Sequence, residues 1–395
     1  MIHAVVFAYP QALSYSGQTA TTMLAIRELE ALGWECRSID FIALDRTQSP
    51  AQRYIRYGFG VLGAWVRLAV SALYGQPVIV FNHGQSLNSF LRMGLAHLVL
   101  RKLLPRRKMI SSLHGSTFMT WAHDSREMRF FLRLLRASDA ITVLGLKQRS
   151  RLVDLGIPAN RVRVLPNTAN IEHATEEDVC AKHMALTQDP AMPIVLLHLS
   201  LLIESKGYGE FLDACHTYAI SSDRPVRPID IQLVGPMHFT SYCKNFTTPE
   251  LKRAAIESKI EELNALPHVS ARWIEGAHGV EKEALFEAAH IFVFPSRFPV
   301  EAQPLVLLEA MAAGCALIAS DQGEIPSTMG EDSGLCLTDL SAESIAQALT
   351  LYIGDDDQRL AAALAGRRRA AHDFSAKTYG ENWHKLLADS GLEEA

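Results

Sequence analysis

The sequence predicts an α/β fold with two Rossmann-like domains, each a doubly wound parallel sheet, that face each other across a cleft. Three observations support this fold class. The 395 residues suit two domains at about 150 residues each. A hydrophobic content of 48% and a charged content of 21% are typical of a globular protein with large cores. Short apolar runs alternate with helical patterns, and the alternation begins again after the middle of the chain.

In the first half, each short apolar run predicts a strand, and the stretch after it predicts a helix. The run at residues 2–9 predicts the first strand, and the spacing over 18–32 predicts an amphipathic helix. Further strands are expected over 36–41, 77–82, 109–114, 140–144 and 162–166. Strands that alternate with helices in this way form a parallel sheet with helices on both faces.

The second half repeats the pattern, with strands expected over 194–199, 229–234, 271–274, 291–294 and 316–319. Residues 168–193 are polar, acidic and weakly periodic, so we place the domain junction there. The first domain is expected over 1–180 and the second over 190–373, with a last helix within 374–395. Because open α/β sheets bind ligands at the carboxyl ends of their strands, the chemistry is expected in the strand-to-helix loops.

Charge and cysteine usage narrow the class of protein. The net charge is −5, with a surplus of basic residues up to Asp189 and of acidic residues after it. Such asymmetry fits two bodies with different partners, or chance surface composition. Six scattered cysteines without a C-x-x-C pair favour reduced core residues in a cytosolic protein. We recognise no secretory signal, and the longest apolar run, 59–74, is shorter than the roughly 20 residues of a membrane-spanning helix.

Residues 294–323 carry the most informative chemistry. A strand is expected to end at Phe294, a polar loop follows, and Pro304 is expected to open a helix. The free N–H groups and the dipole at a helix start attract phosphate or sugar oxygens. Glu301 precedes this helix and Glu309 lies one to two turns inside it. Two carboxylates at this interval can accept hydrogen bonds from hydroxyl groups on separate rings of one ligand.

The segment reads E-A-Q-P-L-V-L-L-E, with P-S before it, E-A-M-A-A-G in its helix and A-S-D after the helix. It resembles the E-x7-E signature of retaining glycosyltransferases of the GT-B fold, family 4 type. The resemblance implies that Glu301 contacts the donor sugar and Glu309 the nucleotide ribose. It also implies that the backbone at Gln303, Pro304 and Leu305 meets the sugar and the diphosphate, and that the last helix packs back on the first domain.

A second segment follows the first strand of the second domain. Ser205 is expected to cap the next helix and to place Lys206 in its first turn, where a lysine is favoured beside an anion. The segment resembles the family pattern G-R-x5-K-G, whose two basic residues bind the donor diphosphate. Lys206 and Gly207 match this pattern, whereas Ser200 and Leu201 stand where Gly-Arg is usual. One positive charge of the pattern is therefore missing.

The first domain holds less specific matches. Gly17 follows the first expected strand, as does the family's Gly-Gly loop, which lets the backbone approach donor and acceptor; an ordinary turn is the alternative. His114, followed by Gly115, resembles the family's H-G motif, whose histidine lies beside the reacting sugar; a structural histidine is the alternative. Residues 164–167, V-L-P-N, resemble the segment that closes the family's first domain.

The sequence points to no metal site and no cofactor; a nucleotide-diphosphate sugar would be a substrate. It contains no H-E-x-x-H, G-x-S-x-G or Walker A motif, and no histidine cluster with metal-ligand spacing. Asp355, Asp356 and Asp357 follow Gly354 and precede a helical pattern. These carboxylates are expected to cap a helix N-terminus rather than to bind a metal.

Two apolar stretches with basic residues favour peripheral contact with an anionic membrane surface. Residues 90–108 interleave apolar side chains with six basic ones: Arg92, Arg101, Lys102, Arg106, Arg107 and Lys108. Arg53, Arg56 and Arg67 flank or interrupt the apolar stretch 59–73. The alternative is a pair of core-packed helices with solvated arginines.

The resemblance implies a retaining, metal-independent hexosyltransferase. Such an enzyme moves a sugar from a nucleotide-diphosphate sugar to a carbohydrate or lipid-linked saccharide, in bacterial polysaccharide or glycolipid synthesis. A cytoplasmic location, peripheral on the inner face of the plasma membrane, and no nucleic-acid partner are expected. Because one fold hosts several activities, a nucleotide-sugar epimerase, a phosphorylase and a non-catalytic binding protein stay open as alternatives.

Overall fold

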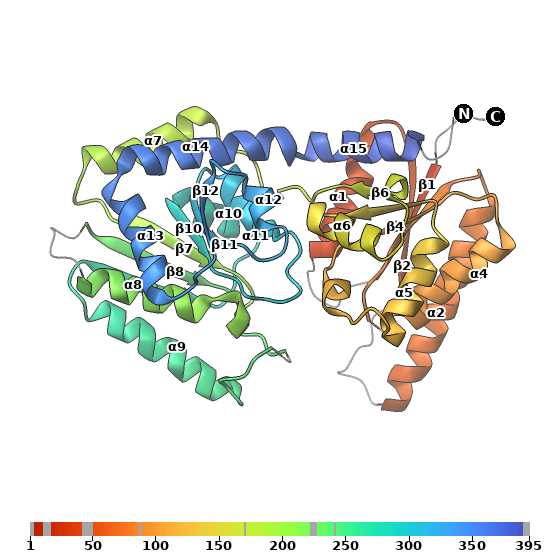
Figure 1. Cartoon of the computed structure of the whole chain (residues 1–395), viewed down its shortest axis with the longest axis horizontal. Helices are drawn as coiled ribbons and strands as arrows, with labels where there is room; N and C mark the ends of the chain where they lie inside the picture. Colours follow the sequence, from red (N-terminus) through yellow and green to blue (C-terminus); the bar gives the residue numbers. More distant parts are fainter. Residues whose placement is uncertain are drawn as a thin grey trace. The chain divides into compact units, whose positions relative to one another are not determined.

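The computed structural model divides into two compact units, Met1–Thr168 with Ser375–Ala395, and Ala169–Phe374 (Figure 1). We call them unit 1 and unit 2 and describe each by itself. The structure describes residues 4–10, 17–41, 50–86, 89–169, 171–221, 227–240 and 242–389.

Unit 1 is built on a parallel sheet with the strand order β2-β1-β3-β4-β5-β6. Its strands are β1 (Ala4–Pro10), β2 (Glu35–Phe41), β3 (Val78–Asn82), β4 (Met109–Ser112), β5 (Ala140–Val143) and β6 (Val162–Val164). Its helices are α1 (Gly17–Ala31), α2 (Pro50–Leu73), α4 (Leu95–Leu103), α5 (Arg126–Arg136), α6 (Leu146–Asp154) and α15 (Ala376–Asp389). Shorter turns are η1 (Phe90–Gly94), η2 (Thr117–Thr120) and η3 (Ala159–Arg161).

Helices cover both faces of this sheet because alternate side chains of a strand point to opposite sides. Val5 and Phe7 of β1 belong to an apolar cluster with α1 and α15. Val6 and Ala8 belong to a second cluster with α2, η1 and α4. Burial on both faces explains why these strands are continuous apolar runs in the sequence.

The last helix returns to unit 1 and packs on α1 (Figure 1). The ring of Trp383 meets Phe7 edge-on, with centroids 5.5 Å apart. The Tyr379 hydroxyl donates a hydrogen bond to the carbonyl oxygen of Thr21 at 3.4 Å. Aromatic anchors on α15 thus fix it against the start of the chain.

Unit 2 contains a second parallel sheet, with the strand order β12-β11-β10-β7-β8-β9. Its strands are β7 (Ile194–Leu199), β8 (Ile229–Val234), β9 (Val269–Ile274), β10 (Ile291–Phe294), β11 (Ala316–Ser320) and β12 (Gly334–Leu337). Its helices are α7 (Glu176–Gln188), α8 (Tyr208–Ser221), α9 (Pro249–Asn264), α10 (Val280–Ala288), α11 (Leu305–Ala312), α12 (Ile325–Met329), α13 (Ala342–Gly354) and α14 (Asp356–Asp373), and η4 (Glu204–Lys206) is a 3-10 turn. The two parallel sheets confirm the predicted fold class.

Two features differ from the sequence expectation. Strand β12 pairs with β11 but is short and only partly buried, so its apolar signal is weak. The segment placed at the junction contains α7, and unit 1 ends at Thr168 rather than near residue 180. The segment with α7 belongs to unit 2 because hydrogen bonds join it to the end of α11. The amide of Ala174 donates to the carbonyl oxygen of Ala312 at 3.0 Å, and the Lys182 ammonium donates to the carbonyl oxygen of Ala313 at 2.7 Å.

The acidic run before α14 has the structural role that was expected. The carboxylate of Asp355 accepts a hydrogen bond from the Gln358 amide at 2.9 Å and caps the helix. Asp356, in the first turn, forms an ion pair with the buried Arg359 at 2.6 Å. These carboxylates stabilise the start of α14.

Candidate functional site

The candidate site lies at the carboxyl edge of the unit 2 sheet, where the strand order reverses. Strand β8 lies on one side of β7, and β10 lies on the other. The loops that follow β7 and β10 therefore diverge at this point, which is where doubly wound sheets bind ligands. Lys206 belongs to the first loop and Glu301 to the second.

Lys206 and Glu301 form an ion pair across the two loops. The Lys206 ammonium lies 2.5 Å from Oε2 of Glu301, and both side chains are largely shielded from solvent. The Ser296 hydroxyl donates to the same carboxylate oxygen at 2.9 Å. The ammonium also lies 4.8 Å from the centre of the Phe298 ring, which adds a cation–π attraction. The pair brings the two predicted charged residues together.

Gly207 allows the two loops to approach closely. Its φ of +83° is in the left-handed region, and a Cβ there would lie 2.3 Å from the carbonyl oxygen of Pro295. The adjacent Ser205 carbonyl accepts a hydrogen bond from the Arg297 amide at 2.7 Å. A side chain at position 207 would separate the loops, because only glycine tolerates both the φ value and this contact.

The predicted helix start at Lys206 is wrong in detail. Lys206 ends the 3-10 turn η4, Gly207 follows it, and α8 begins only at Tyr208. Ser205 does not cap a helix, because Ile203 occupies the cap position of η4 without a side-chain hydrogen bond. The left-handed glycine separates the turn from α8, so the Lys206 ammonium is turned towards Glu301 instead.

Glu309 lies on α11 and is almost fully buried beside a lysine that the sequence analysis missed. Oε1 of Glu309 lies 2.6 Å from the ammonium of Lys282, in the first turn of α10. Oε2 is buried and has no hydrogen-bond partner among the described residues. Burial raises the pKa of the Glu309 carboxyl, while the Lys282 charge acts in the opposite direction. A lysine in the first turn of a helix opposes the helix dipole. This unfavourable position was the sequence feature that could have indicated an acidic partner for Lys282.

The backbone before α11 places the remaining predicted residues. Pro304 is the N-cap of α11 rather than its first residue, and Leu305 begins the helix. Pro304 is extended, with a ψ of 124°, so it ends the loop instead of starting the helix. The buried Gln303 side chain donates to the Thr328 hydroxyl at 3.1 Å. Gln303, Pro304, Leu305 and Glu309 thus lie along one loop-to-helix segment.

The position of the missing basic residue is filled by an exposed apolar side chain. Leu201 follows β7 and exposes 47% of its surface. Its neighbour Ser200 is buried, and the Ser200 hydroxyl lies 3.0 Å from Nε2 of His198. Leu201 therefore supplies no charge to the loop after β7.

The predicted residues of unit 1 also come together, at the carboxyl edge of its own sheet. Thr21 lies between them: its hydroxyl donates to the Gly17 carbonyl at 2.9 Å and lies 3.4 Å from Nδ1 of His114. The Ser112 hydroxyl lies 3.2 Å from Nε2 of His114. Burial lowers the pKa of His114 to about 4, although a hydrogen bond with Asn167 acts in the opposite direction. The imidazole is therefore neutral at pH 7.

Two doubly wound parallel sheets in one chain, the second with a charged site at its switch point, define the GT-B class. Residues 187–369 match the family described as Glycosyl transferases group 1, and residues 15–173 match Glycosyltransferase Family 4. The chain therefore belongs to the GT-B glycosyltransferases of the family 4 type. This confirms the family that the E-x7-E segment indicated.

Individual relatives agree with this assignment. A protein of Escherichia coli K12, named as a colanic acid biosynthesis glycosyltransferase, is 22% identical over 81% of this chain and 74% of its own length. The alpha-maltose-1-phosphate synthase of Mycolicibacterium smegmatis is 26% identical over 61% of this chain and 60% of its own length. The crystal structure of Anabaena HepE with UDP has a TM-score of 0.68 at 15% identity, covering 97% of this chain and 99% of HepE.

Proposed function

We propose that this chain is a retaining, metal-independent hexosyltransferase. It moves a sugar from a nucleotide-diphosphate sugar to a carbohydrate or lipid-linked saccharide in bacterial polysaccharide or glycolipid synthesis. The observation that carries the proposal is the Lys206–Glu301 pair at the switch point of unit 2. The name of the E. coli relative supports the biosynthetic role. The HepE structures with UDP and with UDP-glucose support the donor class.

In this proposal, Lys206 supplies the positive charge for the diphosphate. Its ammonium is bound to Glu301 in this structure, and a diphosphate competes for it with a larger negative charge. Neutralising the leaving diphosphate stabilises the charge that develops as the glycosidic bond breaks. Glu301, released from Lys206, accepts hydrogen bonds from hydroxyl groups of the donor sugar.

Glu309 receives the ribose hydroxyl groups. Lys282 binds Oε1 and favours the charged carboxylate, which leaves Oε2 as the acceptor. The start of α11, four residues before Glu309, presents the backbone N–H groups of Leu305 and Val306 to sugar or phosphate oxygens, while the Leu307 amide donates to the Pro304 carbonyl. Lys282 is thus a positioning residue that acts on the ribose through Glu309.

His114 contacts the reacting sugar as a neutral hydrogen-bonding group. Its pKa of about 4 keeps it from carrying a charge near pH 7. The departing phosphate accepts the proton of the attacking hydroxyl. The new bond then forms on the face that the leaving group vacates, which retains the anomeric configuration.

Calorimetry and transfer assays in EDTA test this function. The full chain is titrated with UDP, GDP and ADP, and the matching sugar nucleotides are then assayed with saccharide acceptors. We expect one nucleotide to bind and its sugar to be transferred with the donor's anomeric configuration, as read by proton NMR. Loss of binding in EDTA contradicts the metal-independent mechanism, and an inverted product contradicts retention. Conversion of the sugar nucleotide without an acceptor would indicate an epimerase instead.

We further propose that unit 1 contacts an anionic membrane surface through α2 and α4. Both helices pack on the same face of the sheet, in one apolar cluster. In α2, the buried face is formed by Ala64, Leu68 and Ala72, while a second set of apolar residues is exposed. This set, spaced three or four residues apart along one side of the helix, consists of Phe59, Leu62, Val66, Val70 and Leu73.

Exposed apolar residues on an ordinary surface are scattered singly, whereas these five form one continuous stripe. Phe59 exposes 72% and Leu73 62% of their surface. Exposed Arg56 on α2, and exposed Lys102 beside exposed Leu103 on α4, supply positive charge next to the apolar side chains. Arg67 on α2 is exposed too, but it is paired with Asp40 at 3.3 Å. Within the described residues, no helix has the length and apolar character needed to cross a membrane. Apolar side chains flanked by basic ones support binding at the surface of an anionic leaflet.

A further inference from the structure

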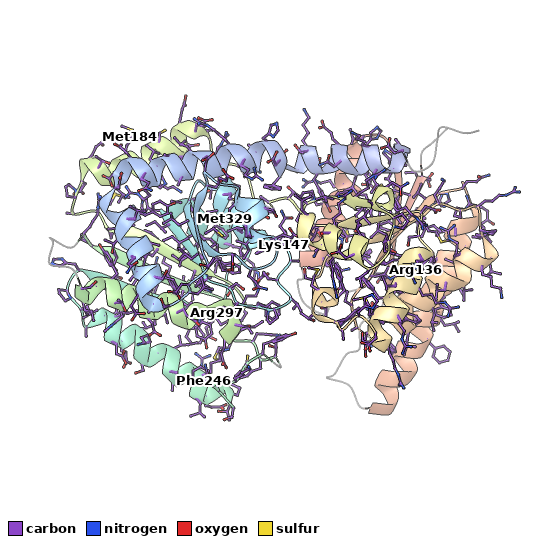
Figure 2. The ribbon with its side chains drawn as sticks, in the orientation of Figure 1. Arg136, Lys147, Met184, Phe246, Arg297 and Met329 are labelled. Carbon is purple, nitrogen blue, oxygen red and sulfur yellow. The ribbon has the colours of Figure 1, made fainter. Side chains whose placement is uncertain are left out.

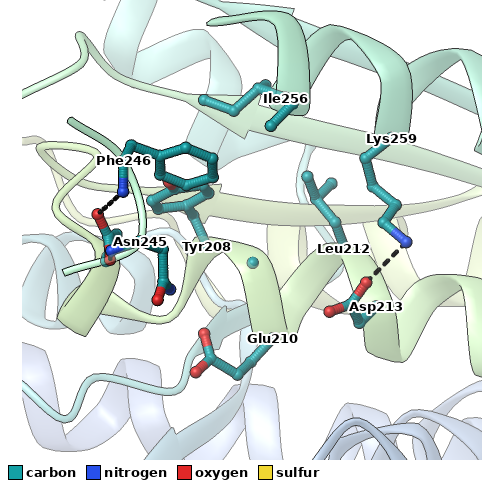
Figure 3. Close-up of a pocket in the computed structure, with 11 residues that line it drawn as sticks. Tyr208, Glu210, Leu212, Asp213, Asn245, Phe246, Ile256 and Lys259 are labelled. Atoms are coloured by element: carbon teal, nitrogen blue, oxygen red, sulfur yellow. Dashed lines mark hydrogen bonds and ion pairs between the residues drawn. The ribbon is translucent and has the colours of Figure 1, made fainter. Parts of the chain in front are cut away.

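A cavity of about 230 Å³ opens in unit 2 beside the Lys206 turn, between α8, α9 and the segment before α9. Tyr208, Leu212, Phe246 and Ile256 give it apolar and aromatic walls, and Asn245 adds an amide. Figure 3 shows Tyr208 and Phe246 towards one end and the Asp213–Lys259 pair towards the other. The volume is below the roughly 300 Å³ at which sites for drug-sized ligands begin, so the cavity suits a single ring.

The wall that carries Asn245 and Phe246 is held in place by Glu204. One carboxylate oxygen of Glu204 accepts the amides of Lys244 and Asn245 at 2.9 and 2.8 Å. The other accepts the amide of Phe246 at 3.3 Å. Three amides on one carboxylate fix this loop, so the cavity is formed before a ligand arrives.

Tyr208 lines the cavity, and its buried hydroxyl has no hydrogen-bond partner within the part of the chain that the structure describes. The residue exposes only 4% of its surface. A buried hydroxyl without a partner is unfavourable, and native structures contain few of them. A ligand with a hydroxyl group would satisfy it.

The charges at the rim argue against an ionic ligand. Asp213 is paired with Lys259 at 2.9 Å, and Glu210 forms an ion pair with Arg297, which Figure 2 labels on unit 2. Asp213 and Glu210 are offset by these cations and Glu204 already accepts three amides, which disfavours a free cation. Lys259, the cation in the lining, is paired as well, which disfavours an anion. A purely apolar ring would leave the Tyr208 hydroxyl unsatisfied. A neutral ring with several hydroxyl groups fits the volume, the aromatic walls, the buried Tyr208 hydroxyl and the paired charges of this cavity.

We propose that this cavity binds one saccharide unit, such as a residue of the acceptor or product glycan, separately from the nucleotide sugar. Aromatic rings pack against the C–H face of a sugar, while the Tyr208 hydroxyl, the Asn245 amide and the Glu210 carboxylate bond its hydroxyl groups. That the sugar belongs to the acceptor or product glycan rests on the proposed function. The presence of a saccharide site in this cavity does not depend on it.

The cavity shares its wall with the candidate donor site. Lys206 lies between Glu204 and Tyr208, on the turn that leads into α8. Arg297, the partner of Glu210, binds the Ser205 carbonyl through its amide and the Leu340 carbonyl through its guanidinium, each at 2.7 Å. A sugar bound to Glu210 therefore holds the same two loops that carry Lys206 and Glu301.

Saturation-transfer NMR on the full chain with glucose, galactose, mannose and N-acetylglucosamine tests the site. A saturating concentration of whichever nucleotide binds, UDP, GDP or ADP, is present in one series and absent in the other. We expect at least one sugar to bind saturably in both series, which separates this site from the donor site. Ala255→Trp, which adds a large ring to the lining, should abolish the binding. Tyr208→Phe should weaken it about three- to tenfold, as expected for one hydrogen bond.

Tyr218→Phe, on the same helix but outside the lining, is the matched control and should bind like the natural chain. Thermal unfolding of each variant shows whether it is folded. The proposal is overturned if no sugar binds saturably. It is also overturned if folded Ala255→Trp and Tyr208→Phe variants both bind like the control. Failure of all three nucleotides to bind would count against the proposed function, whereas the binding of the sugars alone decides the proposal for this cavity.

Discussion

Lys282 and Glu309 form a buried ion pair on neighbouring helices: the ammonium lies 2.6 Å from Oε1, and the carboxylate side chain is only 2% exposed. Burial raises the pKa of Glu309, and Lys282 opposes that effect. The lysine therefore favours the charged form of a carboxylate whose burial favours the protonated form.

Replacing Lys282 with Met should raise the pKa of Glu309 further. The carboxylate is then lost at higher pH, so the acidic limb of the pH profile for nucleotide affinity moves upward. Calorimetric titration of the bound nucleotide between pH 5 and 8 measures this shift. Lys282→Arg should restore the profile, and Lys377→Met, at an exposed lysine of unit 1, should leave it unchanged. A Lys282→Met profile identical to that of the natural chain would contradict the role of the pair.

Glu301→Gln should lower kcat/KM by about 100-fold, the scale seen when one charge-stabilising contact is removed from an active site. The amide leaves the partly buried Lys206 ammonium without its counter-charge. The variant should therefore also unfold at lower urea concentration. Lys206→Met should chiefly weaken nucleotide binding.

The double variant Lys206→Met/Glu301→Gln distinguishes a coupled pair from two independent residues. We expect its unfolding free energy to exceed the value that the two single variants predict by addition. Strict additivity would mean that the two side chains do not interact in solution.

Several buried histidines should make the chain less stable in mild acid. Burial lowers the pKa to about 3 or 4 for His83, His114, His183, His198 and His290. An unfolded histidine binds a proton below about pH 6.5. Between pH 6.5 and about 4 the unfolded state thus holds protons that the folded state lacks. The free energy of unfolding should fall as the pH falls through this window.

Urea unfolding at pH 7.5, 6.5 and 5.5 measures that slope. His198→Gln should reduce it by roughly 1 kcal/mol per pH unit, because the His198 ring is fully buried. His123→Gln, at an exposed position, should not change it. An equal slope in all three proteins would mean that His198 takes up its proton over the same pH range in the folded and the unfolded state.

Removing apolar side chains from α2 should weaken membrane binding. Full burial of one large apolar side chain is worth about 1.5–3 kcal/mol, so Phe59→Ser/Leu62→Ser should lower vesicle partitioning tenfold or more. Co-sedimentation with phosphatidylglycerol vesicles at low salt measures this, and Val280→Ser, at an exposed apolar residue of unit 2, is the control. If the natural chain does not pellet with anionic vesicles, α2 and α4 do not bind membranes.

Periodicity in the sequence predicted the strands well where burial is complete. Strands β7, β8 and β10 match the expected ranges to the residue, because apolar side chains predominate in strands covered on both faces, although β8 also contains Asp230 and Gln232. The exposed edge strand β12 gave no such signal, since its side chains are only partly buried. Helix α7 was not predicted, because the polar residues that cap it and bind it to the rest of unit 2 resemble those of a linker.

At the candidate site, sequence motifs located Glu301, Glu309 and Lys206 but not their partners. Lys282 is 27 residues from Glu309 along the chain, and no local pattern joins them. The left-handed Gly207 displaced the expected helix start, because a backbone turn of this kind depends on its contact with Pro295. Contacts between residues that only the sheet topology brings together can therefore be identified only from the structure.

The most direct test of the central claim is a crystal structure of the full chain with the nucleotide sugar that binds most tightly. We predict the diphosphate within hydrogen-bond distance of the Lys206 ammonium, the sugar on Glu301 and a ribose hydroxyl on Oε2 of Glu309. A nucleotide sugar bound away from these three side chains, with the Lys206–Glu301 pair intact, would contradict the account.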